Sequence, residues 1–373
     1  MARKKKAAEY VQRVYALCDA AWDLDYGPAQ VALLEEAVHI ADAHNDADLG
    51  YEVRQYLIDS ATFGGCPDIA LVAFAWCVSR ADEDAQRFDP EPLYWKYKWI
   101  ATAAPKFPTI PREHIDQLLA DMHQRYVAAG IGLHPFYQTR RNVYLYMGNI
   151  AAAQQDHEQV LRHESNPMSD CTACEQDSAV RLHLEAGNFV EAEAAAQPIL
   201  EKRLRCAEVP HRTYAMLLLP LLENNAPELA KSYHRAGLRL IKVQLNFLQE
   251  AALHILFLTI TDNLTSAVRL TQRYLPIYMA SRCPAWRFDF ERVLSFVCQR
   301  LAQTSSPLRL RWPDNFPLPE GLDPRDYLSL AQHFRSQAQL LAQAFDARNG
   351  NSYFHSLLAQ RDAWPQRVRP LPL

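Results

Sequence analysis

The sequence predicts an all-α protein, built as a right-handed solenoid of antiparallel helix pairs. Apolar residues recur with helical spacing along most of the 373 residues, and alternating runs of the β-strand type are few. The 11 glycines tend to fall at short joints between these periodic segments. Small residues also recur at a nearly constant interval, which is typical of repeat proteins.

The periodic segments divide the chain into helices separated by short joints. In order, we expect helices over residues 8–23, 29–44, 47–62, 67–81, 91–103, 111–129, 136–147, 149–163, 172–186, 189–205, 211–223, 227–243, 246–261, 264–281, 285–302, 324–348 and 351–361. The first of these, within residues 1–24, is expected to cap the array.

The repeat itself is marked by alanines that follow the joints. Ala153, Ala192, Ala230 and Ala267 are spaced by 39, 38 and 37 residues, and each follows a joint that contains glycine, asparagine or proline. Two antiparallel helices can approach closely only where one of them offers a small side chain. We therefore expect each alanine to mark the crossing of one helix pair.

These joints resemble those of tetratricopeptide repeats. In Gly187-Asn-Phe-Val-Glu-Ala192 a glycine turn precedes an aromatic residue and then a small residue, as at the joint of that family. Gly65-Cys-Pro-Asp-Ile-Ala70 and Gly27-Pro-Ala-Gln-Val-Ala32 are weaker examples. The resemblance implies degenerate tetratricopeptide-like repeats over residues 25–302, because the full consensus is only partly met.

The repeat pattern stops near residue 303. Residues 303–323 are rich in proline yet carry Leu308, Leu310, Trp312, Phe316 and Leu318, which makes them too apolar for a free linker. We expect this connector to pack along the array. Residues 324–373 are expected to form capping helices and a tail. Asp323 is the expected N-cap of the long helix, proline follows it, and Asn349-Gly350 are expected to end that helix.

Composition excludes several classes of protein. A net charge of -4 gives no global field that would attract nucleic acid. No stretch approaches the about 20 apolar residues of a membrane span. The basic start Met1-Ala-Arg-Lys-Lys-Lys6 leads into an amphipathic segment and not into an apolar signal core. Eight cysteines without such a signal fit reduced thiols, and we expect a cytoplasmic protein.

A cluster of metal-ligand residues lies in the middle of the array. Cys171 and Cys174 form a C-x2-C step, and Cys206 and His211 form a C-x4-H step 32 residues later. The first pair begins one predicted helix and the second follows the antiparallel helix that returns, so the two ends of the hairpin should meet. The sequence therefore predicts a structural zinc site with three thiolates and one imidazole.

Two alternatives to the zinc site stay open. The cysteines could be inert core thiols, or Cys171 and Cys174 could form a redox pair whose thiolate is favoured by the helix N-terminus. The other five cysteines stand singly and are interpreted as core.

Two segments combine aromatic and basic side chains. In Tyr94-Trp-Lys-Tyr-Lys-Trp99 the helical spacing places Trp95 and Trp99 on one face, which indicates a packed helix with a solvated lysine face and not a nucleic-acid contact. Tyr137, Arg140, Arg141 and Tyr144 form a second such face. Surface ion pairing is the favoured role of this face, and ligand contacts in the groove are the alternative.

Enzymatic signatures are missing from the sequence. It contains no Gly-Lys-Ser/Thr phosphate loop, no G-x-S-x-G, no H-E-x-x-H and no dinucleotide fingerprint. We therefore expect a non-enzymatic scaffold that binds a partner protein or peptide in its groove. A sensor that closes on a signalling peptide or nucleotide is the alternative, and an enzyme with a cryptic site is a third.

Three short segments carry a second resemblance. Asp170-Cys-x-x-Cys174, Cys206-x-x-x-Pro210-His211 and Phe345-Asp-x-Arg-Asn-Gly350 resemble segments of a group of bacterial tetratricopeptide-type proteins. The resemblance implies a bacterial cytosolic protein and supplies neither a reaction nor a ligand.

Overall fold

The computed structural model describes residues 8–304 and 308–373, and within them the protein is all-α. The basic start Met1–Lys6 lies outside the described residues. The α-helices are α1 (Glu9–Trp22), α2 (Pro28–Ala43), α3 (Ala47–Phe63), α4 (Pro67–Glu83), α5 (Glu91–Ala103), α6 (Arg112–Ala128), α7 (His134–Tyr146), α8 (Ile150–Arg162), α9 (Thr172–Glu185), α10 (Phe189–Leu200), α11 (His211–Glu223), α12 (Pro227–Leu238), α13 (Leu248–Ile260), α14 (Leu264–Ala280), α15 (Pro284–Gln303), α16 (Tyr327–Asn349) and α17 (Tyr353–Ala363). Three short 3-10 helices, η1 (Ala104–Lys106), η2 (Leu245–Phe247) and η3 (Trp364–Arg367), complete the described elements.

Each predicted helical segment contains one α-helix, and prediction and structure differ only in the residues at which a helix begins or ends. The predicted helix over residues 189–205 ends at Leu200, because the chain turns at Lys202, whose φ is 62°. Arg203 and Leu204 both donate their N–H groups to the carbonyl of Pro198 in this turn. The segment after α10 is therefore irregular, and it carries Cys206.

Helices next to each other in sequence pack as pairs. Extensive contacts join α1–α2, α3–α4, α7–α8, α9–α10, α11–α12, α13–α14 and α15–α16, and α2 also packs on α3. The four crossing alanines predicted from their spacing, Ala153, Ala192, Ala230 and Ala267, are all fully buried in these pairs. This outcome agrees with a close approach of the paired helices. At the weaker joint Ala32 is exposed and Val31 is buried instead, because the buried face of α2 begins one residue earlier.

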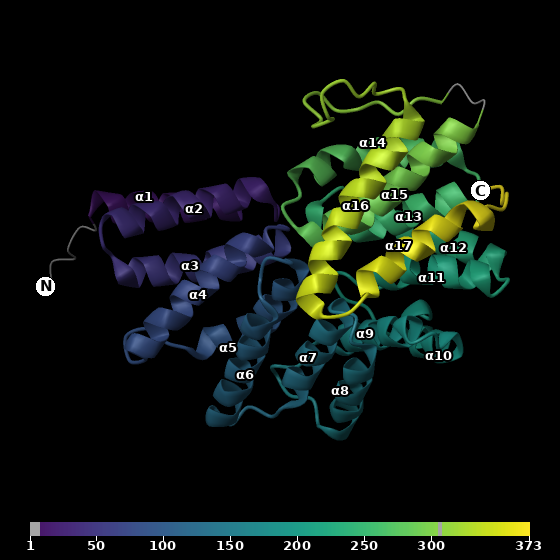
Figure 1. Ribbon diagram of the computed structural model, residues 1–373. Helices are drawn as coiled ribbons and strands as arrows, with labels where there is room; N and C mark the ends of the chain where they lie inside the picture. The colour runs from purple at the N-terminus through teal and green to yellow at the C-terminus, as the bar shows by residue number, and fades with distance from the viewer. Residues whose placement is uncertain (1–7, 305–307) are drawn as a thin grey trace, which may run out of the picture.

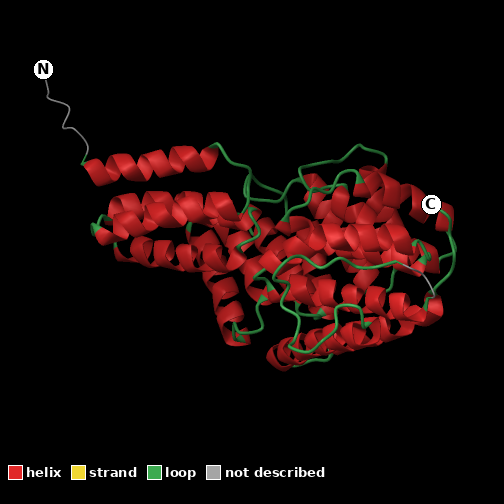
Figure 2. Ribbon diagram, turned by 90° about the horizontal axis from the view of Figure 1, so that it is seen from above, coloured by secondary structure: helices red, strands yellow, loops and turns green. Residues whose placement is uncertain are grey.

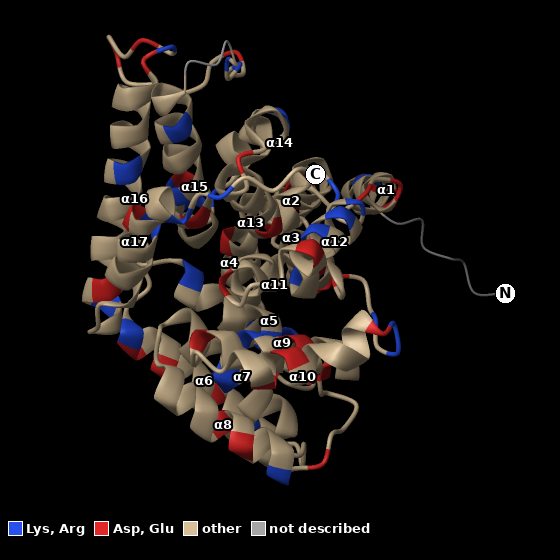
Figure 3. Cartoon of the chain, turned by 90° about the vertical axis from the view of Figure 1, so that its right-hand side faces the viewer, with Lys and Arg blue, Asp and Glu red and all other residues tan. Residues whose placement is uncertain are grey.

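The pairs follow one another across the molecule in sequence order. Helices α1–α4 form one end, α5–α10 run below and between, and α11–α17 form the other end (Figure 1). Every regular element drawn is a helix when the molecule is seen from above (Figure 2). Basic and acidic segments are mixed along the helices in the side view of Figure 3.

The apolar interior is divided into two large clusters. One contains buried residues of α1–α7, and the other extends from α9 to η3. A small cluster of Leu145, Ala153 and Leu182 is separate from both. Buried polar side chains also gather on α5, α7 and α8, and we call this set the polar layer. The apolar side chains of the described residues therefore form two large, separate cores.

The C-terminal helices return to the middle of the chain. Arg348, near the end of α16, donates hydrogen bonds to the carbonyls of Pro105, Phe107 and Ile110 at 2.8, 3.1 and 3.3 Å. Asn351 donates to the carbonyl of Met147 at 2.7 Å. These bonds join the α16–α17 turn to segments more than 200 residues earlier.

The proline-rich connector packs on the second core over its described part. Leu310 is buried, and Leu308, Trp312, Phe316 and Leu318 pack against the same cluster. The predicted N-cap of the following helix is wrong. Asp326 caps α16 by accepting from Ser329 N at 3.1 Å, while Asp323 accepts from Arg325 N within the preceding turn. Gly350 ends α16 in the left-handed conformation, as predicted.

None of the helices in the described part of the chain combines the length and the apolar character needed to cross a bilayer.

Candidate metal centre

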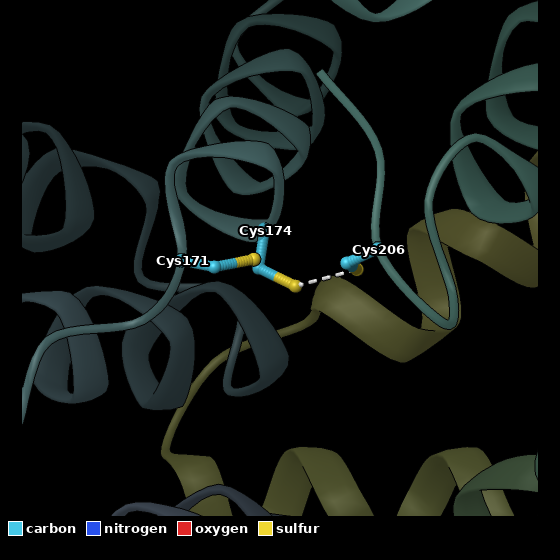
Figure 4. A group of neighbouring side chains, drawn as sticks. All are labelled: Cys171, Cys174 and Cys206. Carbon is cyan, nitrogen blue, oxygen red and sulfur yellow. Dashed lines mark hydrogen bonds between the residues drawn. The ribbon is translucent and has the colours of Figure 1, made fainter.

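Three cysteines meet at the start of α9. Cys171 is the N-cap residue of α9, and Cys174 lies in its first turn. Cys206 comes from the irregular segment between α10 and α11, where its N–H donates to the carbonyl of Val209 at 3.0 Å. Figure 4 shows the two segments bringing the three side chains together. The sequence prediction that the ends of this hairpin meet is confirmed for the cysteines.

The sulfur atoms have spacings that a zinc ion accepts. All three lie within 4.8 Å of one another, and Cys174 Sγ is 3.3 Å from Cys206 Sγ. Thiolates bound to zinc at about 2.3 Å in a tetrahedron are separated by about 3.8 Å. That separation falls within the 4.8 Å limit that all three sulfur atoms satisfy, and all eight cysteines of the chain are free thiols. The three cysteines could therefore hold a metal ion.

The surroundings of Cys174 disfavour a free thiolate. Burial raises the pKa of Cys174, and the neighbouring Cys206 and Cys171 raise it further. The N-terminus of α9 acts in the opposite direction, because its partial positive charge favours an anion. A bound cation would add a much larger positive charge and stabilise the thiolates outright. The chemistry of the group thus suits a metal better than a reactive thiol.

Buried polar side chains position the segment that carries Cys171. Lys98 is 3% exposed, and its Nζ lies 2.9 Å from Oδ1 of Asp170, directly before Cys171. Gln138 is fully buried, accepts from Asp170 N at 2.9 Å and donates to Oε2 of Glu175 at 2.8 Å. Lys98 and Gln138 belong to α5 and α7, so the polar layer fixes the start of α9.

An apolar base lies under the cysteines. Ala173, Ile199 and Val209 are buried together, with Cys174 and Cys206 packed against them. This small cluster connects the start of α9, the end of α10 and the segment after it. Cys174 and Cys206 are therefore held against apolar side chains, while Cys171 is exposed.

The fourth predicted ligand, His211, lies outside the cysteine group. Its ring stacks on Phe247, with centroids 5.5 Å apart and planes 13° apart. Nδ1 of His211 is buried without a hydrogen-bond partner among the described residues, and burial lowers the pKa of this histidine. His211 is the first residue of α11, so the helix that begins there directs its ring to η2.

The five remaining cysteines are buried, as predicted for core residues. Burial raises the pKa of Cys18 and Cys66 to about 11 and that of Cys77 to about 12. These thiols are protonated and belong to the apolar clusters.

Packing between α7 and α8 occupies both arginines of the predicted groove face. Arg141 is fully buried, and its Nη1 lies 3.2 Å from Nδ1 of His157. Arg140 makes a two-bond ion pair with Asp156, at 2.8 and 2.6 Å. Asp156 therefore engages the guanidinium of Arg140, whereas Nη2 of Arg141 is buried without a hydrogen-bond partner among the described residues. The favoured ion-pair role thus holds for Arg140, although Asp156 is buried.

The two tyrosines of that face have different surroundings. Tyr137 packs against His163, with ring centroids 4.9 Å apart. Tyr144 is half-buried and lines a small cavity beside Arg112.

The predicted solvated lysine face of α5 is wrong. Lys96 is 6% exposed and pairs with Asp59, and Lys98 pairs with Asp170. The ammonium of Lys98 also lies 3.6 Å from the ring centroid of Trp95. Helix α5 packs on α3, α4, α6 and α7, so no side of this helix is left for solvated lysines.

The positioning residues Lys98 and Gln138 could not be identified from the sequence. Their partners lie 72 and 32 residues away, and no spacing rule connects them. No protein-family model and no curated protein matches this chain.

Proposed function

We propose that the chain is a non-enzymatic interaction scaffold, a tetratricopeptide-like solenoid that binds a segment of a partner protein. In this proposal Cys171, Cys174 and Cys206 would hold a zinc ion. The metal stabilises the fold and takes part in no reaction. We place the protein in the bacterial cytoplasm, following the resemblance of its motifs.

The observation that carries the proposal is a groove between α10, α11 and α12. It has a volume of about 450 Å³. Leu217 and Leu221 of α11 form its floor, while Leu200 and Tyr233 are half-buried on its sides. An apolar floor of this kind accepts the apolar face of a helix or alternate side chains of an extended peptide.

The rim of the groove is acidic. Glu193 of α10 and Glu201, the C-cap residue of α10, are exposed and line it, and no basic side chain is among its lining residues. Glu201 is paired with Arg203 at 2.7 Å, so Glu193 carries the unpaired charge of the rim. Acidic rims select partners with complementary charge and increase their association rate. The partner segment should therefore be amphipathic, with apolar anchors flanked by lysine or arginine.

The cysteine group packs against Ile199, the neighbour in sequence of the groove residue Leu200. Leu200 and Glu201 are at the end of α10, and Cys206 follows in the segment that returns to α9. A metal held by Cys206 and the start of α9 would fix the position of that end. The proposed zinc would therefore pre-organise the groove, which reduces the entropy lost on binding.

A peptide-display selection tests this function. Peptides selected on the zinc-loaded protein should carry apolar residues at helical spacing with basic flanks. The variant Glu193→Lys should bind them about tenfold more weakly, because it reverses one rim charge. Glu191→Lys is the matched control, since Glu191 is exposed on the same helix and does not line the groove. Equal effects of the two variants, or selected peptides without basic residues, would contradict the groove as the binding site.

A further inference from the structure

Five α-helices and one 3-10 helix form a closed ring within the molecule. The first helices of successive pairs, α7, α9, α11, α13 and α15, each contact the next, and η1 contacts both α15 and α7. In Figure 3 these five α-helices follow one another in an arc. Side chains from different members of the ring can therefore meet inside it.

Charged and aromatic side chains from several members of the ring meet at Tyr146, the last residue of α7. The guanidinium carbon of Arg181, on α9, lies 4.2 Å from the ring centroid of Tyr146. Nζ of Lys106, on η1, lies 5.1 Å from the same centroid and 5.4 Å from that of Trp286 on α15. Both cations are therefore within reach of one small anion placed at the edge of the Tyr146 ring.

The positive charge around Tyr146 acts on its hydroxyl. Burial raises the pKa of Tyr146, yet Lys106, Arg181 and Arg212 together lower it by more, so the pKa lies below its ordinary value. Arg212 belongs to α11, which is not next to α7 in the ring, so its charge acts across the ring. An anion near this hydroxyl would be stabilised by the same charges.

Arg212 itself is balanced by acidic side chains. Glu208 lies 2.6 Å from its Nη2, and Glu250 lies 3.6 Å from its Nε. Asp177 is buried near the same guanidinium, where it accepts from the hydroxyl of Thr213 at 2.5 Å. We therefore do not expect Arg212 to contact a ligand directly.

Lys106 and Arg181 have no such counter-charges. Within the part of the chain that the structure describes, neither forms an ion pair with a carboxylate. Glu185, one turn after Arg181 on α9, accepts from the hydroxyl of Tyr353 at 2.8 Å. Both cationic side chains are half-buried, and their nitrogen atoms remain accessible to solvent. Lysine and arginine are seldom withdrawn from solvent without a partner, so this pair indicates an anionic ligand.

We propose that Lys106, Arg181 and the hydroxyl of Tyr146 bind the phosphate group of a small phosphorylated molecule. A phosphomonoester carries about two negative charges at neutral pH, which two cations without counter-charges match, whereas a carboxylate carries a single charge. The guanidinium can donate two parallel hydrogen bonds, and the ammonium acts as a point charge. Because the elements of the ring surround these side chains, a small molecule fits them better than a polymer does.

This phosphate site is separate from the proposed scaffold groove. None of its three residues lines the groove beside α10. Loss of phosphate binding would therefore leave the binding of partner peptides unchanged, and failure of the peptide selection would leave the phosphate site untouched.

Calorimetry and thermal unfolding with matched compounds test the site. The compounds are phosphoserine with serine, AMP with adenosine, and inorganic phosphate with succinate, all at constant ionic strength. At least one phosphate compound should bind saturably and raise the Tm of the wild-type protein by several degrees, while its unphosphorylated counterpart should do neither. Succinate shows whether two carboxylates on one molecule are sufficient.

Three variants locate the binding. Arg181→Gln and Lys106→Gln should each weaken it about tenfold or more, because each removes one of the two charges. Tyr146→Phe keeps the ring against which both cations lie and removes a single donor, so it should weaken binding several-fold and remain as stable as the wild type. The control is Arg269→Gln, exposed on α14, which should bind as the wild type does.

Several results would overturn the phosphate site. These are no binding of any phosphate compound, equal binding of an unphosphorylated counterpart or of succinate, and wild-type affinity in both charge variants. Binding of a phosphoserine-containing peptide without binding of the small phosphate compounds would also overturn it. If a charge variant does not fold, wild-type affinity in Tyr146→Phe contradicts the proposed contact with the hydroxyl.

Discussion

A Cβ atom at Gly148 would lie 2.3 Å from Cβ of Tyr353, a residue at the start of α17. This close approach is possible only because residue 148 has no side chain. Gly148 also has a φ of 72°, which disfavours other residues. The start of α17 therefore packs directly against the turn between α7 and α8.

Replacing Gly148 by alanine should destabilise the protein more than the same change at Gly187. Gly187 has a φ of 77°, yet a Cβ there would meet nothing within 4 Å. Gly187→Ala should lower the free energy of unfolding by about 1 kcal/mol from backbone strain alone. Gly148→Ala adds a steric clash and should cost about 1–3 kcal/mol more. Urea unfolding measures both, and equal losses would show that α17 does not pack on this turn.

Zinc content should depend on Cys206. The purified wild-type protein should contain about one equivalent of zinc per chain, and Cys206→Ser should contain less than about half an equivalent. Hydrogen exchange of residues 172–210 should become faster in the variant. Cys66→Ala is the control, because Cys66 lies far along the chain in another cluster. A wild-type protein without zinc would support inert thiols, and a loss of two hydrogens per chain by mass would support a redox pair.

His211 should be dispensable for metal binding. The variant His211→Phe removes both ring nitrogens and retains an aromatic ring to stack on Phe247. It should keep its zinc, and it should be no less stable, because it also removes a buried Nδ1 that lacks a partner. Elemental analysis of the zinc content of His211→Phe and Cys206→Ser, measured side by side, tests this prediction. Loss of zinc from His211→Phe would restore the four-ligand site predicted from the sequence.

The buried pair of Lys98 and Asp170 should respond unequally to the loss of each partner. Asp170→Asn leaves the ammonium of Lys98 buried without a counter-charge, which should cost about 3–5 kcal/mol. Lys98→Met leaves Asp170, whose side chain is 31% exposed and can be hydrated, so the loss should be clearly smaller. Chemical denaturation measures the two losses. The reverse order would mean that Lys98 is hydrated in solution.

A buried histidine pair should make the protein less stable in weak acid. His234 and His254 place their Nδ1 atoms 3.0 Å apart, and burial lowers their pKa values to about 4 and about 3. The unfolded chain takes up these protons below pH 6.5, whereas the folded chain does not, so stability falls as the pH falls from about 6.5 towards 4. Each histidine should contribute a loss on the order of 2 kcal/mol between pH 7 and pH 5.

The double variant His234→Gln/His254→Gln isolates this effect. It should lose less stability than the wild type between pH 7 and pH 5, whatever its stability at pH 7. Glu250, whose pKa burial raises to about 7, acts in the opposite direction and is present in both proteins. The exposed His39→Gln serves as the control. Parallel stability curves for the wild type and the double variant would contradict the prediction.

Local signals predicted the helices well. Each predicted segment contains a helix, because apolar periodicity and joint residues act over a few positions. The alanine spacing similarly predicted four buried crossings, since the close approach of paired helices is a local requirement. Helix ends were less predictable. The sequence favoured Asp323 as the cap because proline follows it, yet Asp326 accepts from the first turn of α16.

The candidate metal centre was likewise predicted only in part. The spacing of Cys171, Cys174 and Cys206 was sufficient to predict that three thiols meet. It did not predict that His211 would stack on Phe247, because that contact depends on how α11 packs against η2. The burial of Lys98 and Arg141 could not be predicted from the sequence either. A lysine or arginine looks solvated in a sequence, and its burial depends on a partner supplied by another helix.

The sequence by itself thus determined the helices, their pairing and the three cysteines, because each depends on residues close together in the chain or on one hairpin. Only the tertiary structure decided the two cores, the burial of polar side chains on α5, α7 and α8 and the contacts of the α16–α17 turn. These features depend on helices far apart in sequence, such as α16 against the α7–α8 turn. Burial and hydrogen-bond partners are properties of that packing, and no local pattern encodes them.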